Sequence, residues 1–140
     1  MTWQFWAVLS AAFAALTAIL AKVGIQGMNS DFATLIRTIV ILAALALFVL
    51  ATRQYQSLAS ISPRSLVFLV LSGLATGASW VCYFRALKLG KASLVAPVDK
   101  LSVVLVAVLG VLFLGEKLAP RNWVGILLIA LGAALVAWKR

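Results

Sequence analysis

Five apolar stretches alternate with short polar connectors along the chain. The stretches are 17–23 residues long, and a helix that rises about 1.5 Å per residue needs roughly 20 apolar residues to cross a hydrocarbon core of about 30 Å. The pattern therefore predicts an all-α integral membrane protein in which residues 1–140 form a single transmembrane domain. The predicted helices cover residues 3–21, 32–52, 65–84, 92–114 and 122–138.

Composition supports this prediction and narrows the possible chemistry. Hydrophobic residues make up 65% of the chain and charged residues 11%, whereas soluble domains are about half apolar and about a quarter charged. Histidine is absent and Cys82 is the single cysteine, which excludes an intrachain disulfide, a Cys/His zinc site and a histidine-dependent catalytic triad. We therefore expect no enzyme, no catalytic residues, no metal and no cofactor.

The formal charge of +9 comes from 12 basic and 3 acidic residues. In a soluble protein such a charge would suggest a nucleic-acid partner, but here the basic residues are scattered among the connectors and form no continuous basic stripe. We expect no nucleic-acid partner. The partners expected instead are the lipid bilayer and a small-molecule solute.

The basic residues outside the spans divide unevenly between the two sides of the membrane. The side of the N-terminus has four, at Arg53, Arg64, Lys117 and Arg121, and the other side has six, at Lys22, Arg85, Lys88, Lys91, Lys139 and Arg140. Basic residues favour the cytoplasmic side, so this small excess only slightly favours a cytoplasmic C-terminus. Both orientations stay open, and a protein that inserts both ways can form an antiparallel homodimer.

Three charged side chains fall inside predicted spans: Arg37, Asp99 and Lys100. Each costs several kcal/mol at the centre of a bilayer. In one interpretation they line a substrate cavity, and two cations against one anion favour an anionic or zwitterionic solute. In the other, Arg37 pairs with Asp99 and holds the helices together, while Lys100 reaches to the interface. Asp99 and Lys100 should project about 100° apart on a helix.

Pro97 lies two residues before Asp99. Proline lacks a backbone donor and crowds the carbonyl four residues earlier, which predicts a kink that could serve as a hinge. The alternative is a helix that begins at Val95 or Ala96 with Pro97 in its first turn.

Trp80 and Tyr83 are three residues apart and share one face of the third span. An aromatic wall is typical of a pocket for a small organic solute, and packing between helices is the competing interpretation. Gly125 and Gly132 are seven apart and share a stripe of the fifth span, where another helix could approach closely.

Several runs resemble a known family. Residues 83–97 (YFRALKLGKASLVAP) and 111–118 (VLFLGEKL) resemble the EamA domain of the drug/metabolite transporter superfamily, and Arg37 matches a basic residue common early in its second helix. Residues 125–132 (GILLIALG) resemble the last-helix motif of the small multidrug resistance relatives, where this stripe makes the dimer contact. In this chain, packing within one bundle is the alternative role of Gly125 and Gly132.

The resemblance extends over essentially the whole chain and implies one five-helix EamA repeat. Because most members carry two such domains, it also implies a half-size transporter that works as a dimer by alternating access. We expect a secondary transporter in the inner membrane of a bacterial or archaeal cell. The alternatives are a subunit of a lipid-linked sugar flippase or an accessory or structural membrane subunit. The family usually has apolar or mildly polar residues where this chain has Asp99 and Lys100.

Overall fold

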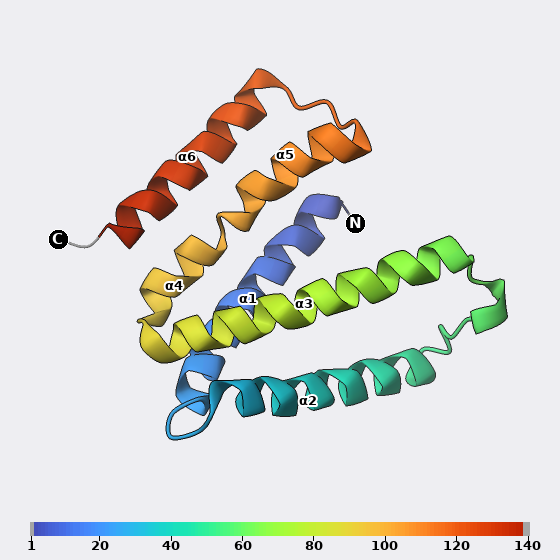
Figure 1. Ribbon diagram of the computed structural model, residues 1–140. Helices are drawn as coiled ribbons and strands as arrows, with labels where there is room; N and C mark the ends of the chain where they lie inside the picture. Colours follow the sequence, from blue (N-terminus) through green and yellow to red (C-terminus); the bar gives the residue numbers. More distant parts are fainter. Residues whose placement is uncertain (1, 139–140) are drawn as a thin grey trace. The chain divides into compact units, whose positions relative to one another are not determined.

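The computed structural model describes residues 2–138. Lys139 and Arg140, two of the six basic residues predicted on the side of the C-terminus, lie outside the described residues. The described residues form helices and no strand. In chain order the helices are α1 (Trp3–Gly24), α2 (Ser30–Ala51), the short 3-10 helix η1 (Leu58–Ser60), α3 (Pro63–Leu89), α4 (Ala92–Asp99), α5 (Ser102–Leu114) and α6 (Pro120–Ala137) (Figure 1).

Five helical segments of the described chain are long and apolar enough to cross a membrane. They are α1, α2, α3, α6 and the segment Ala92–Leu114, which contains both α4 and α5. This confirms the predicted class of an all-α protein with five transmembrane helices.

The chain divides into two compact units. One runs from Ala21 to Lys88 and contains the end of α1, all of α2 and almost all of α3. The other consists of the residues up to Leu20 together with those from Leu89 onward, and contains α4, α5 and α6.

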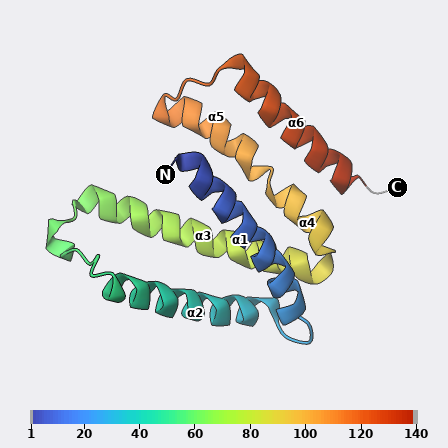
Figure 2. The same ribbon diagram turned by 180° about the vertical axis from the view of Figure 1, so that it is seen from behind.

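In the unit Ala21–Lys88, α2 and α3 meet where α2 begins and α3 ends, and they diverge towards the connector that carries η1 (Figures 1 and 2). The side chain of Asn29 caps α2 by accepting hydrogen bonds from the backbone N–H groups of Asp31 (2.8 Å) and Phe32 (3.2 Å). Small side chains on α2 and larger ones on α3 are buried at this end, namely Ser30, Ala33, Thr34, Phe84 and Leu87.

Helix α3 is longer than its predicted span, because it continues to Leu89 and includes Arg85 and Lys88. The predicted third span ends at residue 84, which puts both residues in the connector that follows it. Long cationic side chains are favourable in the last turns of a helix, where the carbonyl groups carry partial negative charge. Helix α3 therefore continues through Arg85 and Lys88, beyond the end of the apolar run.

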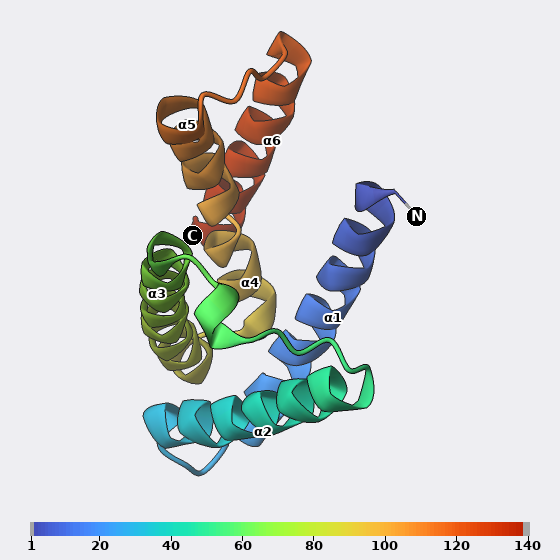
Figure 3. The same cartoon turned by 90° about the vertical axis from the view of Figure 1, so that its right-hand side faces the viewer.

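In the other unit, α6 packs against α4 and α5 and runs antiparallel to them (Figure 3). The buried positions here are small: Ala18 on α1, Ala107 and Gly110 on α5 and Ala133 on α6. Small residues let helix backbones approach closely inside a membrane, where apolar side chains gain little by leaving lipid.

The fourth span is interrupted at Lys100 and Leu101, where α4 ends and α5 begins (Figure 1). The Leu101 N–H bonds the Val98 carbonyl at 3.0 Å and the Val103 N–H bonds the Lys100 carbonyl at 3.0 Å. These bonds span three residues instead of four, so the chain tightens locally into 3-10 geometry. Because α4 begins at Ala92, Pro97 lies beyond its first turn, and the alternative start at Val95 or Ala96 is wrong.

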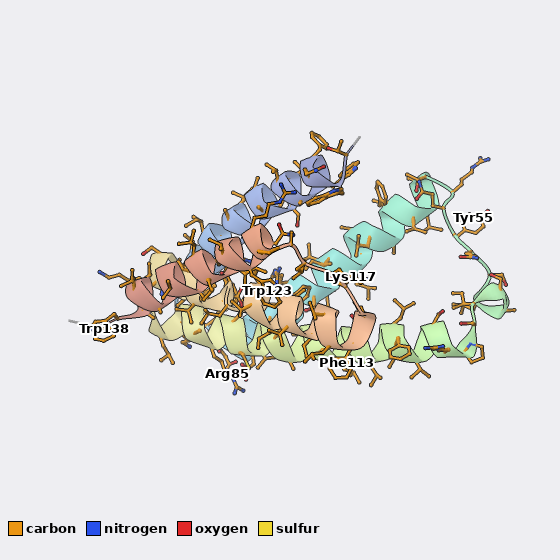
Figure 4. The ribbon with its side chains drawn as sticks, turned by 90° about the horizontal axis from the view of Figure 1, so that it is seen from above. Tyr55, Arg85, Phe113, Lys117, Trp123 and Trp138 are labelled. Carbon is orange, nitrogen blue, oxygen red and sulfur yellow. The ribbon has the colours of Figure 1, made fainter. Side chains whose placement is uncertain are left out.

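Two tryptophans mark the ends of α6. Trp123 lies near the start of the helix and Trp138 directly after its end (Figure 4). At about 1.5 Å per residue they are separated by roughly 22 Å along the helix axis, which is shorter than the hydrocarbon core of about 30 Å. An indole ring prefers the headgroup layer on either side, so these residues can fix how α6 sits in the bilayer.

Candidate functional site

Arg37 is held by two aromatic rings of α3. Its guanidinium carbon lies 4.3 Å from the centre of the Trp80 ring and 5.4 Å from the centre of the Phe84 ring. Both distances are within the range of about 6 Å in which a cation is attracted to the electron-rich face of a ring. Trp80 and Phe84 are four residues apart, so both project from α3 on the side where α2 approaches.

The local structure of α2 presents Arg37 on the face that meets α3. Ser30, Ala33, Thr34 and Arg37 follow the spacing of one helical face, and the first three are buried. The Thr34 hydroxyl donates to the Ser30 carbonyl at 2.8 Å, which satisfies that buried hydroxyl within its own helix. Arg37 lies about 10 Å along the axis from the start of α2, which is about a third of the way along this membrane-spanning helix.

Tyr83 lies beside this cluster. Its ring meets the Phe84 ring edge to face, with 6.5 Å between the centroids, a distance typical of paired aromatic side chains. Phe84 is 2% exposed. It is therefore the buried centre of an aromatic group that includes Tyr83 and contacts Arg37.

Polar contacts join the helices at one end of the unit Ala21–Lys88. Arg85 donates from Nε to Oδ1 of Asp31 at 2.9 Å and from Nη2 to Oδ2 at 2.7 Å. Lys88 Nζ donates to the Met28 carbonyl at 2.7 Å, and Lys22 Nζ donates to the Leu87 carbonyl. We call these contacts the α3 clasp, because they tie the end of α3 to the end of α1 and the start of α2. Arg85 lies at the opposite end of the unit from Tyr55 (Figure 4).

Asp99 and Lys100 lie at the interruption between α4 and α5. Their side chains approach each other, with Lys100 Nζ 3.6 Å from Asp99 Oδ2, and both are exposed within their unit. The expected divergence of about 100° applies to a regular helix. Here the helix is interrupted, and the long lysine side chain reaches the neighbouring carboxylate.

Gly125 and Gly132 lie on α6 and are exposed. A Cβ atom built at either position would meet no other heavy atom within 4 Å among the described residues. Within the unit that contains α6, neither glycine is therefore used for close packing, and the stripe is open there to another helix.

Of the sequence-predicted residues, Arg37 meets Trp80 in one unit and Asp99 meets Lys100 in the other. Sequence reasoning missed Phe84, since a phenylalanine in an apolar run carries no special signal; its spacing of four from Trp80 could have revealed it. It also missed the pairing of Asp31 with Arg85, which are 54 positions apart.

Comparison with known proteins identifies the family. The model of the EamA-like transporter family matches residues 1–138. A protein of Sinorhizobium described as an uncharacterized transporter in the cobO 3′ region is 65% identical over 136 residues, which cover 97% of this chain and 96% of the relative. No solved structure matches the chain. The chain therefore belongs to the EamA-like transporter family and is a multi-pass membrane transporter.

Proposed function

We propose that the protein is a half-size secondary transporter that moves a small anionic or zwitterionic organic solute. The five-helix repeat formed by residues 1–140 is its single domain, and the inner membrane of a bacterial or archaeal cell is its location. The family supports membrane transport, and the charge of the solute is inferred from Arg37.

The observation that carries this proposal is the setting of the Arg37 guanidinium. It lies within a membrane-spanning helix and contacts aromatic rings. Asp31 is the sole acidic residue between Ala21 and Lys88, and it already pairs with Arg85 through both carboxylate oxygens. The unit therefore supplies no second carboxylate to neutralise Arg37. A cation kept inside a membrane span at such a cost is typical of a binding site.

The other predicted residues complete the proposed set of substrate contacts. Tyr83 joins Arg37 and Trp80 as part of the aromatic wall. In the second unit, Asp99 and Lys100 are exposed at an interrupted helix, and interrupted membrane helices commonly carry the binding groups of transporters. Pro97 lies just before this interruption and is the proposed hinge, because it removes one backbone hydrogen bond of α4.

We further propose that two copies of the chain form the working unit, in parallel or antiparallel arrangement. The open stripe at Gly125 and Gly132 supports a contact through α6. In such a homodimer, rocking of one copy against the other would expose the bound solute to each side of the membrane in turn.

The test is a comparison of solute charge at constant size. Purified protein is reconstituted in sealed liposomes, and uptake is measured for labelled carboxylates of about three to ten carbons, with the amino acids and amines of matching skeleton. We expect uptake of carboxylates or amino acids and none of the amines. Neutralising Arg37 or Lys100 in Arg37→Gln or Lys100→Gln should abolish uptake, because each removes a cation proposed to contact the solute.

Arg64→Gln is the matched control. Arg64 lies in the first turn of α3, and its guanidinium carbon is 5.9 Å from the Phe68 ring, so it is a second arginine beside an aromatic residue. This variant should transport normally. Uptake of the amines alone, or full activity of Arg37→Gln, would show that the proposed solute class is wrong.

A further inference from the structure

The two rings beside Arg37 restrict how its guanidinium can bind an anion. A ring that stacks on the planar guanidinium occupies one of its faces, while the five N–H donors point outward in the plane of the group. The guanidinium carbon lies 4.3 Å from the centre of the Trp80 ring and 5.4 Å from the centre of the Phe84 ring. No N–H group of Arg37 donates a hydrogen bond to a described residue of the unit Ala21–Lys88. These donors are therefore available to a planar acceptor with two oxygens.

Phe84 limits the movement of the Arg37 guanidinium. It is 2% exposed, it contacts Tyr83 edge to face, and it lies one helical turn after Trp80. A ring so enclosed has little freedom to change its orientation. Both rings come from the continuous helix α3, so the guanidinium rests on a rigid support, as a precise binding group requires.

The balance of charge limits the anion to one negative charge. Arg37 contributes one positive charge, the charges of Lys100 and Asp99 balance each other, and Asp31, the acid nearest to Arg37 in sequence, is paired with Arg85. A phosphate ester carries about −1.5 to −2 charges at pH 7, so pairing it with one guanidinium would leave uncompensated negative charge within the membrane span. A carboxylate has one charge and the flat shape that the two parallel N–H groups of the fork match.

We propose that Arg37 binds the carboxylate of the transported solute through both oxygens, and that Phe84 is a positioning residue that holds the guanidinium for this contact. The substrate class is a small organic molecule with a single carboxylate, which includes amino acids. This inference rests on the proposed transport function and adds to it the geometry of recognition and the role of Phe84.

The experiment uses the full chain in liposomes. The solute is the carboxylate that is taken up fastest in the panel of carboxylates, amino acids and amines described above. Arg37→Lys keeps the positive charge but loses the planar fork, and should raise the KM for uptake by about tenfold or more, as expected for losing a charge-assisted bidentate contact. Phe84→Leu should raise KM while the maximal rate per folded protein changes little. Phe84→Tyr keeps a ring at this position and should retain a KM near that of the unchanged protein.

The matched control is Phe68→Leu, which removes the ring beside Arg64 and should leave KM unchanged.

A fluorescence measurement accompanies the uptake rates. Adding the carboxylate should alter the tryptophan fluorescence of the unchanged protein. This change should be absent in Trp80→Phe, because Trp80 contacts the Arg37 guanidinium that binds the carboxylate. The phosphonate of the same carbon skeleton should compete poorly for uptake.

The failures can be told apart. If Arg37→Gln is inactive but Arg37→Lys and Phe84→Leu have an unchanged KM, a positive charge suffices, and the inference is overturned while the proposed function stands. If the phosphonate competes as well as the carboxylate, the substrate class is wrong. If no anion or amino acid of the panel is taken up by the unchanged protein, the proposed function itself fails.

Discussion

Gly115 ends the fourth span with a backbone conformation that other residues rarely adopt. Its φ is +67°, in the left-handed region, and its N–H bonds the Gly110 carbonyl. The N–H of Glu116 reaches the same carbonyl at 3.2 Å, and a Cβ atom at Gly110 would lie 2.7 Å from a Glu116 carboxylate oxygen. The chain thus folds back tightly over the end of α5, which directs it into the connector before α6.

This turn predicts the effect of replacing its glycine. Gly115→Ala should lower the free energy of unfolding by about 1–2 kcal/mol, because a Cβ atom is disfavoured at positive φ. The measurement is thermal unfolding in detergent. Gly73→Ala is the control: Gly73 lies inside α3 with open space around it, so this change should be neutral or slightly stabilising. Equal unfolding temperatures for Gly115→Ala and Gly73→Ala would show that a side chain at position 115 does not strain the turn.

At the scale of residues, the sequence indicated which side chains are unusual in a membrane span but not which residues they contact. Arg37 could be selected because a charge in an apolar run is costly wherever it points. Its contacts with Trp80 and Phe84 could not be predicted, because they form only through the approach of α2 to α3, although Trp80 itself was selected for the aromatic wall. Asp99 and Lys100 were identified by the same cost of charge, but their mutual contact depends on an interruption that only the backbone shows.

At the scale of elements, the α3 clasp explains why α2 and α3 stay together at one end. The bidentate pair of Arg85 with Asp31 is partly exposed, with 61% and 44% of the two side chains accessible. An exposed pair is screened by water and salt. The bonds from Lys88 and Lys22 to backbone carbonyls share the same end of the unit, so several modest contacts act at one place.

The clasp predicts a coupled pair of substitutions. Asp31→Asn and Arg85→Gln should each lower the unfolding temperature, and the double variant should be no less stable than the more damaged single variant, because either change already removes the same contact. The differences should shrink at high salt. A double variant whose loss equals the full sum of the single losses would show that the two side chains do not stabilise each other.

The boundaries of the helices could be predicted only in part. The lengths of the apolar runs identified five spans because the bilayer fixes the length of an apolar helix. They missed the last turns of α3, since Arg85 and Lys88 are polar yet helical. The division of the fourth span was foreseen as a kink at Pro97, but the change in hydrogen bonding occurs at Lys100 and Leu101, beyond the proline itself.

At the scale of the whole molecule, each of the two units leaves much apolar surface for lipid and for other helices. The buried hydrophobic positions of the described residues are few and mostly small, as expected when the surrounding medium is itself apolar. Among the outward-facing positions, Gly125 and Gly132 differ from their neighbours because they present almost no side chain. A second helix can approach the backbone there, whereas leucine or phenylalanine would hold it away.

This surface predicts how the proposed dimer can be weakened. Gly125→Leu and Gly132→Leu should each lower the dimer fraction in liposomes, measured by crosslinking at increasing dilution in lipid, because the added side chain prevents close approach. Gly73→Leu is the matched control, since Gly73 is equally open but lies on α3. If Gly73→Leu disrupts the dimer and the α6 variants do not, the contact is made by α3 and the proposed interface is wrong.

The central claim is that this chain alone exchanges an organic anion across the membrane by alternating access. Counterflow tests it most directly: liposomes that contain only the purified chain are loaded with the unlabelled carboxylate, and a trace of the labelled form is added outside. The account predicts a transient accumulation of label inside above its outside concentration, which is lost in Arg37→Gln. Folded protein that shows no accumulation with any carboxylate or amino acid would contradict the account and would favour a subunit that needs another protein.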